Sequence, residues 1–214
     1  MNLYKIYGQT FIPFRLREEN GLKSRCWVGG EPPVGIAPNF ANSFTRHLAT
    51  LGLEERIDVS LFSTFDYSAQ ETPFGFFEAS CMLHDESSAL VQFVVHRPVV
   101  AREVGSPLKS ELSALGFAFD AAKGDPESPT LQSFGNQQIY AGHKVGGVPY
   151  FSQVVGEMEA VVKALADGYV HLLQISFPSN EDSMIRVDWP FGESVFHVFA
   201  KKDGDSITFR YIWA

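Results

Sequence analysis

Two glycines followed, after one residue, by a proline occur twice in the chain, and this repeated element constrains the fold more than any other feature. It reads Val28-Gly29-Gly30-Glu31-Pro32 in the first half and Val145-Gly146-Gly147-Val148-Pro149 in the second. Adjacent glycines permit positive φ and proline fixes φ, a combination that suits a tight reversal after a strand. Neither loop has P-loop or GxGxxG spacing, so we predict a structural role for both rather than phosphate binding.

The order of the elements that follow the two loops also repeats. Each loop is followed by helical spacing, by a glycine that would end the helix (Gly52 or Gly168), and by a strand. On this pattern Val59–Ser63 corresponds to Leu172–Ser176. We therefore predict a single domain over residues 1–214, made of two similar halves at about 1–105 and 106–214. Coincidence in a glycine-rich chain is the alternative.

Three stretches combine helical spacing of apolar residues with capping residues at their ends. These stretches are residues 39–52, residues 106–116 and residues 158–168. In the first of them Phe40, Phe44, Leu48 and Leu51 would form the apolar face of an amphipathic helix.

Apolar or alternating runs bounded by turn residues predict strands. The runs are residues 4–7, 10–16, 22–28, 59–65, 75–82, 89–96, 169–177, 194–200 and 206–213. Pro13 favours an edge position for its strand, because proline cannot donate to a ladder. Asp203-Gly204 predicts a hairpin between the last two strands. The expected fold class is α+β, with a mostly antiparallel sheet and three or so helices.

The chain is acidic, with 25 Asp and Glu against 17 Lys and Arg and a net charge of −8. This charge opposes binding to nucleic acid and to anionic membranes and favours a basic macromolecular partner, although plain solubility explains it equally well. No apolar run resembles a secretion signal or a membrane span, so we expect a cytoplasmic protein. Cys26 and Cys81 have no CxxC spacing, so reduced thiols are expected, with a disulfide between them as the alternative.

The chain lacks the common catalytic signatures, including GxSxG, HExxH and paired Cys and His zinc spacings. We therefore expect no catalytic residue and no cofactor. His143, His171 and His197 would bind a metal if their strands were neighbours, but hydrogen-bonded core histidines are the favoured interpretation. Acidic residues gather near Arg186 and are candidates for a surface that binds a basic partner, or are simply solvated loop charges. They are Glu181, Asp182, Asp188 and Glu193.

In the second half a His-Lys-x-x-Gly-x-Pro-x-x-x-Gln motif at His143–Gln153 precedes Leu-Leu-Gln-Ile at Leu172–Ile175. These segments resemble the YwqG-like family of unknown function, in which the same two motifs follow one another. Ser194–Phe199 and the aromatic last strand are also similar, and the first Gly-Gly loop looks like an earlier element of the family. In the first half Val59–Phe65 lacks the glutamine that the family carries in its strand after that loop.

The resemblance implies an intracellular α+β domain without established enzymatic activity, and relatives are associated with bacterial toxin systems as immunity proteins. Taken with the acidic net charge, which favours a basic partner, it leads us to expect binding and neutralisation of a cognate basic toxin. The alternative is a small-molecule-binding or metal-binding protein, or an enzyme, with a pocket between the two halves where His143 and His171 lie.

Overall fold

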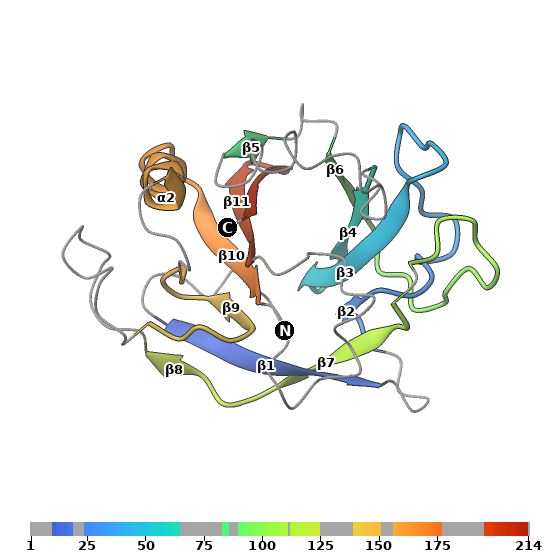
Figure 1. The fold of residues 1–214 in the computed structure, drawn as a ribbon, viewed down its shortest axis with the longest axis horizontal. Helices are drawn as coiled ribbons and strands as arrows, with labels where there is room; N and C mark the ends of the chain where they lie inside the picture. Colours follow the sequence, from blue (N-terminus) through green and yellow to red (C-terminus); the bar gives the residue numbers. More distant parts are fainter. Residues whose placement is uncertain are drawn as a thin grey trace.

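The computed structural model describes residues 10–18, 24–64, 83–85, 90–110, 112–124, 139–150, 156–176 and 195–213. Within these residues the chain forms one α-helix and a 12-stranded sheet (Figure 1). The elements are β1 (Thr10–Glu18), β2 (Trp27–Val28), β3 (Arg46–Glu54), β4 (Ile57–Ser63), β5 (His84–Asp85), β6 (Val91–His96), β7 (Leu115–Phe119), β8 (Lys123–Gly124), β9 (Lys144–Gly146), α2 (Gly156–Ala166), β10 (Val170–Ile175), β11 (Phe196–Asp203) and β12 (Ser206–Trp213).

The sheet is antiparallel at every described pair and runs in the order β5-β12-β11-β10-β9-β1-β7-β2-β3-β4-β6, with β8 paired to β1. It curls until its two ends face each other across the core (Figure 1). Phe93 of β6 stacks on Phe209 of β12 with ring centroids 4.7 Å apart. The backbone N–H of Val91 donates to the hydroxyl of Tyr211 at 3.2 Å. Side chains therefore bridge the two ends of the sheet, between which the described residues form no strand pair.

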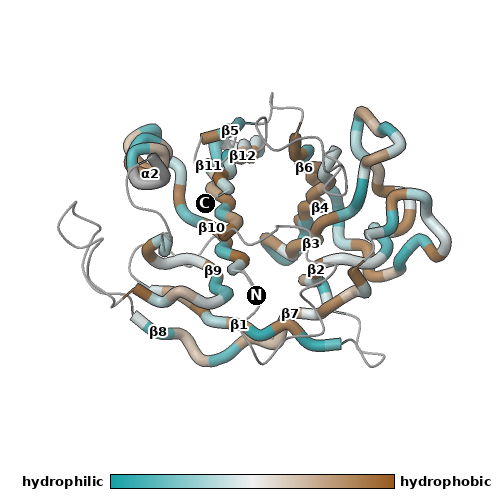
Figure 2. Tube along the Cα trace, in the orientation of Figure 1, coloured by the Kyte–Doolittle hydropathy of each residue, from teal (hydrophilic) through white to brown (hydrophobic). Residues whose placement is uncertain are grey.

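The hydrophobic core fills the inside of this curl (Figure 2). Its members come from both arms of the sheet and include Phe14, Val28, Leu61, Val145, Leu173 and Phe209. Phe14 and Phe117 stack with centroids 4.1 Å apart where β1 meets β7, the middle of the strand order. A second, smaller cluster lies under α2, where Val161 packs against Phe199 and Ile212.

The predicted α+β class with three helices is wrong, because α2 is the one helix among the described residues. The helix predicted at residues 158–168 is confirmed by α2. Residues 46–54 instead form β3, which pairs with β4 in a hairpin. Every residue from His47 to Leu53 is buried, so the spacing of Leu48 and Leu51 marks no single face.

The predicted helix at residues 106–116 is also wrong. Ser106 starts a single turn, in which the Lys109 N–H donates to the Ser106 carbonyl. The chain then pairs with the first glycine loop: the Ser110 N–H donates to the Gly30 carbonyl, and the Gly30 N–H donates to the Leu112 carbonyl. The Ser110 N–H, which would bond the Ser106 carbonyl in an α-helix, is therefore engaged by Gly30, and β7 follows.

The strand predictions for residues 10–16, 59–65, 89–96, 169–177 and the C-terminal hairpin are confirmed. The strand expected at residues 22–28 is described only as β2, while those at residues 4–7 and 75–82 lie outside the described residues. The edge position predicted from Pro13 is wrong, because β1 lies between β9 and β7. Pro13 pairs with Lys144 of β9, and its carbonyl accepts from the Asp120 N–H at 2.8 Å.

The strand order is approximately symmetric about the β1–β7 pair. On one side follow β9, β10, β11 and β12, and on the other β2, β3, β4 and β6. Both glycine loops have positive φ at both glycines, 73° and 64° for Gly29 and Gly30, and 74° and 70° for Gly146 and Gly147. Because β10 pairs with β9 as β3 pairs with β2, the counterpart of Leu172–Ser176 is β3 and not the predicted Val59–Ser63.

No helix in the described part of the chain is long and apolar enough to cross a membrane.

Candidate functional site

Each glycine loop is held by a histidine from the strand that pairs with it. Nδ1 of His47 lies 3.1 Å from the Gly29 carbonyl oxygen. Nδ1 of His171 lies 3.2 Å from the Gly146 carbonyl oxygen and 3.1 Å from that of Gly147. A carbonyl only accepts, so Nδ1 carries the proton in both rings. The sequence reasoning singled out His171 but missed His47, although the matching His-Leu pairs at residues 47–48 and 171–172 were a usable signal.

Close packing explains the glycines of the first loop. A Cβ atom on Gly30 would lie 2.5 Å from Cβ of Ala114, and one on Gly29 would lie 2.8 Å from the Leu112 carbonyl oxygen. Positive φ adds a backbone penalty for any other residue. The Pro32 carbonyl accepts from the Glu103 N–H at 2.9 Å, so the loop continues into paired backbone.

A buried amide and a buried imidazole fasten the second loop. The Gln174 side chain donates from Nε2 to the Gly142 carbonyl and accepts at Oε1 from the Tyr150 N–H, both at 2.9 Å. Nδ1 of His143 accepts from the Ser176 N–H at 3.1 Å. Burial lowers the pKa of His143 to about 4, so its ring is neutral near pH 7. These polar groups serve the backbone on both sides of Gly146 and Gly147.

Lys144 is fully buried at the position that Trp27 occupies in the first half, since both precede Val-Gly-Gly. Its ammonium donates to the Val148 carbonyl and lies 5.0 Å from the centroid of the Phe11 ring. Trp27 is likewise fully buried, and the Arg102 guanidinium lies 4.7 Å above its ring. A carbonyl and an aromatic face replace part of the water that a buried ammonium loses.

Two of the three sequence-predicted histidines are in contact. Nδ1 of His197 lies 3.3 Å from Nε2 of His171. Burial and, second, the Lys144 charge lower the pKa of His171 to about 3. Burial, followed by His171 and Lys144, holds the pKa of His197 well below its usual value. Both rings are therefore neutral near pH 7, and His197 donates to His171.

The third histidine of that set, His143, turns away to Ser176 and stacks on Phe14 with centroids 5.4 Å apart. Across the described ranges no three His, Cys, Asp or Glu side chains are grouped to hold a metal ion.

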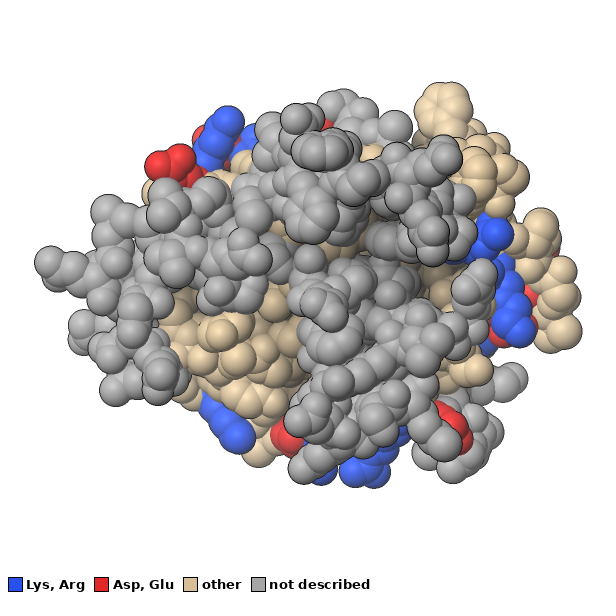
Figure 3. All heavy atoms as spheres, in the orientation of Figure 1, with Lys and Arg blue, Asp and Glu red and all other residues tan. Residues whose placement is uncertain are grey.

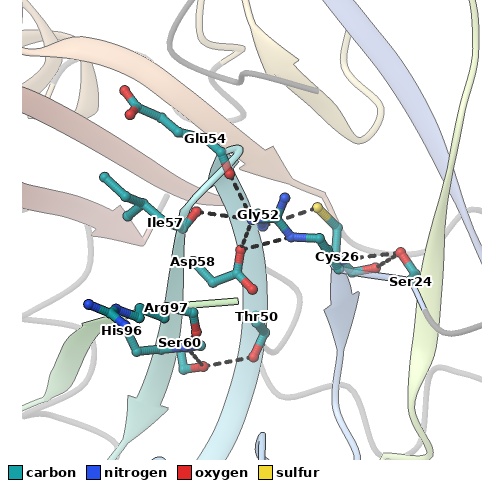
Figure 4. Close-up of polar contacts among 11 residues, drawn as sticks. Ser24, Cys26, Thr50, Gly52, Glu54, Ile57, Asp58, Ser60, His96 and Arg97 are labelled. Carbon is teal, nitrogen blue, oxygen red and sulfur yellow. Dashed lines mark hydrogen bonds and ion pairs between the residues drawn. The ribbon is translucent and has the colours of Figure 1, made fainter. Parts of the chain in front are cut away.

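A chain of polar side chains crosses three strands of the first half. Oγ1 of Thr50 lies 2.9 Å from Nε2 of His47 and 2.8 Å from Oγ of Ser60. Nε2 of His96 lies 2.9 Å from that Ser60 oxygen, and its Nδ1 lies 2.7 Å from the Arg97 carbonyl oxygen (Figure 4). No local sequence pattern predicts this row of hydrogen-bonded side chains, because its members lie on different strands.

Arg25 and Cys26 fasten the β3–β4 hairpin through bonds to Asp58, Glu54 and Gly52, which Figure 4 labels. The Arg25 guanidinium pairs with the fully buried Asp58 and donates to the Glu54 carbonyl at 2.7 Å. Sγ of Cys26 accepts from the Gly52 N–H at 3.3 Å. Cys26 is a free thiol, and burial raises its pKa to about 11, which makes it a poor nucleophile. Cys81 lies outside the described residues.

The most exposed aromatic side chain described is Phe40, with 80% of its surface accessible. The side-chain amide of Gln92 on β6 forms two hydrogen bonds with the Phe40 backbone. Its Oε1 accepts from the Phe40 N–H at 3.2 Å, and its Nε2 donates to the Phe40 carbonyl at 2.7 Å. Asn42 and Thr45 close the next turn, where the Thr45 N–H donates to the Asn42 carbonyl at 3.1 Å. The loop is thus fixed while Phe40, and Phe44 at 47% exposure, face the solvent.

Three further exposed apolar residues lie on two segments that pair with each other through a β-bridge between Pro33 and Arg102. They are Val34, Val100 and Val104. The loop before β3 projects at the upper right of Figure 1, and the tip at that corner is drawn without charged side chains in Figure 3, whereas charged side chains lie below it on the right-hand edge. The sequence reasoning missed this surface because it assigned Phe40 and Phe44 to the apolar face of a helix.

The acidic residues predicted to bind a partner lie outside the described residues. They are Glu181, Asp182, Asp188 and Glu193. The buried histidines described above are neutral and bond to backbone groups, to the Thr50 hydroxyl or to one another, an arrangement that holds loops in place. Comparisons of the chain with protein-family models, with curated proteins and with solved structures found no match.

Proposed function

We propose that the chain is a non-catalytic binding protein that uses the Phe40 loop as an anchor for a protein partner. The observation that carries this proposal is the combination of 80% exposure of Phe40 with two hydrogen bonds from Gln92 to its backbone. Burying a phenylalanine ring contributes about 1.5–3 kcal/mol. A loop that is ordered before binding loses less entropy on association. Aromatic residues, including phenylalanine, are enriched in the cores of protein interfaces, where most of the binding energy is concentrated.

The chemistry of the buried polar groups supports a non-catalytic role. A nucleophile requires an adjacent base or a lowered pKa, whereas the pKa of Cys26 is raised to about 11. His47, His143 and His171 use ring nitrogens to bond backbone groups.

The partner we propose is a basic toxin domain, which would make the chain a cytoplasmic immunity protein. The net charge of −8 supports a basic partner over nucleic acid or an anionic membrane. The resemblance of His143–Gln153 and Leu172–Ile175 to the YwqG-like family supports the immunity role. In this proposal Glu181, Asp182, Asp188 and Glu193 speed association with the toxin, and the Phe40 loop supplies contact area.

The test is calorimetric binding of the basic polypeptide encoded by the neighbouring reading frame. Phe40→Ser should weaken binding at least about tenfold. Its effect on the free energy of unfolding should stay within about 0.5 kcal/mol, because the ring is exposed. Val162→Ser is the matched control, since Val162 is an apolar residue 48% exposed on α2. Reversal of Glu181 and Asp182 to Lys should slow association and reduce its salt dependence.

A complex that binds equally tightly with Phe40→Ser and with the charge reversal would contradict the proposed surface. Elemental analysis of the purified protein addresses the alternative of a metal-binding protein. Stoichiometric zinc or iron would favour that alternative.

A further inference from the structure

The Phe40 loop, residues 40–45, leads directly into an arginine that the turn holds in place. Nη1 of Arg46 donates to the Ser43 carbonyl at 2.8 Å and to the Thr45 carbonyl at 2.9 Å. A guanidinium has five N–H donors in a planar fork, so those on Nε and Nη2 remain for another group. In the described part of the chain Arg46 pairs with no carboxylate. A half-buried guanidinium with unused donors therefore lies at the turn that carries the exposed Phe44 ring.

Side chains fix the backbone from which the two rings and the guanidinium extend. Gln92 bonds the N–H and the carbonyl of Phe40. Oδ1 of Asn42 accepts from the Phe44 N–H at 2.9 Å, and Oγ1 of Thr45 accepts from the Asn42 N–H at 2.8 Å. A ligand therefore loses little loop entropy on binding here. Aromatic residues and arginine are also the types that are enriched in the cores of protein interfaces.

The surface around the Phe40 loop is basic, although the whole chain is acidic. The loop and the segments bonded to it, residues 31–48 and 90–110, contain four Lys or Arg against two Glu, a net charge of +2, whereas the whole chain has −8. The four basic residues are Arg46, Arg97, Arg102 and Lys109. Figure 3 shows Lys and Arg side chains on the right-hand edge, below the tip at which the loop projects. Exposed charges interact over about 8 Å at physiological ionic strength, so the local charge acts on a group in contact with the loop.

We propose that the Phe40 loop binds an acidic segment of a partner protein, in which an apolar side chain packs against Phe40 and Phe44 and a carboxylate pairs with Arg46. The planar guanidinium matches the two oxygens of a carboxylate. This inference rests on the proposed use of the loop as an anchor and names the chemistry of the segment that binds there. A partner that is basic overall satisfies it with one acidic segment, because only nearby charges act on the loop. Phosphates also pair with arginine, but a chain of net charge −8 repels nucleic acid.

The test compares two synthetic peptides on the unaltered protein. One peptide has a leucine and a tryptophan flanked by glutamates, and the other has lysines in place of the glutamates. Each is titrated into ¹⁵N-labelled protein while the backbone amide shifts are followed. The glutamate peptide should shift the amides of residues 40–46. The lysine peptide should bind at least about tenfold more weakly, because it cannot form the charge-assisted hydrogen bonds to Arg46.

Charge reversal separates the contact with Arg46 from an effect of net charge. Arg46→Glu should weaken binding of the glutamate peptide at least about tenfold. Arg56→Glu is the matched control, because it changes the net charge equally and Arg56 is exposed in the turn at the opposite end of β3. The control should change the affinity by less than about twofold. If Arg46→Glu does not fold, the comparison of the two peptides on the unaltered protein still decides.

Three results would overturn the acidic segment as the ligand: tighter binding of the lysine peptide, equal effects of Arg46→Glu and Arg56→Glu, or no shift of the loop amides with either peptide. An oligothymidylate that shifts these amides more than the glutamate peptide does would overturn it in favour of nucleic acid. The proposed function fails on a different measurement, the calorimetric binding of the neighbouring polypeptide to Phe40→Ser. Loss of that binding together with a preference for the lysine peptide would keep the loop as an anchor and refute only its acidic ligand.

Discussion

Replacing Gly30 by alanine tests whether the repeated glycine loop is structural. The new Cβ would lie 2.5 Å from Cβ of Ala114 and 3.0 Å from the Ala114 backbone, in a loop where φ is +64°. Gly35 is a natural control, because its φ is +73° while no atom lies within 4 Å of the position that a Cβ would take there. Both variants lose about 1 kcal/mol to alanine at positive φ. Only Gly30→Ala adds overpacking, about 1–3 kcal/mol.

We therefore expect Gly35→Ala to lower the free energy of unfolding by about 1 kcal/mol and Gly30→Ala to lower it by about 2–4 kcal/mol. Urea unfolding measures both, and an unchanged slope shows that the folded and unfolded states keep their compactness. Equal destabilisation by the two variants would refute the steric reasoning. Equal destabilisation would also mean that the close approach of Gly30 to Ala114 does not affect stability.

Two further predictions concern buried charge. Three histidines have pKa values lowered chiefly by burial to between about 3 and about 4. They are His47, His143 and His171. In the unfolded chain these histidines take up protons below the ordinary histidine pKa of about 6.5. The free energy of unfolding should therefore be greatest above that pH and should fall on acidification, by up to about 1.4 kcal/mol per pH unit for each histidine. A free energy of unfolding that stays constant in urea titrations between about pH 7.5 and about pH 5 would contradict this. Arg25→Ala leaves the fully buried Asp58 without its charge partner and should lower the free energy of unfolding by about 3 kcal/mol. Arg15→Ala should lower it by less than about 1 kcal/mol, because the pair of Arg15 with Asp120 is exposed. Thermal unfolding compares the two variants, and equal destabilisation would show that burial of Asp58 has no effect.

Local signals in the sequence predicted the elements whose structure depends on near neighbours. Asp203-Gly204 identified the hairpin of β11 and β12, and the spacing of Val161 and Leu165 identified α2. The spacing of Phe40, Phe44, Leu48 and Leu51 misled because it runs from an exposed loop into a strand that is buried on both faces. A sequence pattern reports alternation only where one face meets water.

The candidate sites depended on contacts that no local pattern contains. Gln92 reaches Phe40 across 52 residues of sequence, and Ser60 reaches His96 across 36. The three-histidine hypothesis joined residues by predicted strand position alone. The structure brings His171 and His197 together, but the ring of His143 bonds to the Ser176 backbone instead.

The glycine loops explain why the buried histidines are poor guides to function. Two successive glycines at positive φ turn carbonyl groups into the buried interior, where each needs a donor. A neutral imidazole supplies a single N–H from a neighbouring strand without bringing a charge, and both halves use one, at His47 and His171. Their burial and their lowered pKa values follow from this backbone requirement. The ring of Phe40 is exposed and satisfies no backbone group, which is why the binding function that we propose is centred on it.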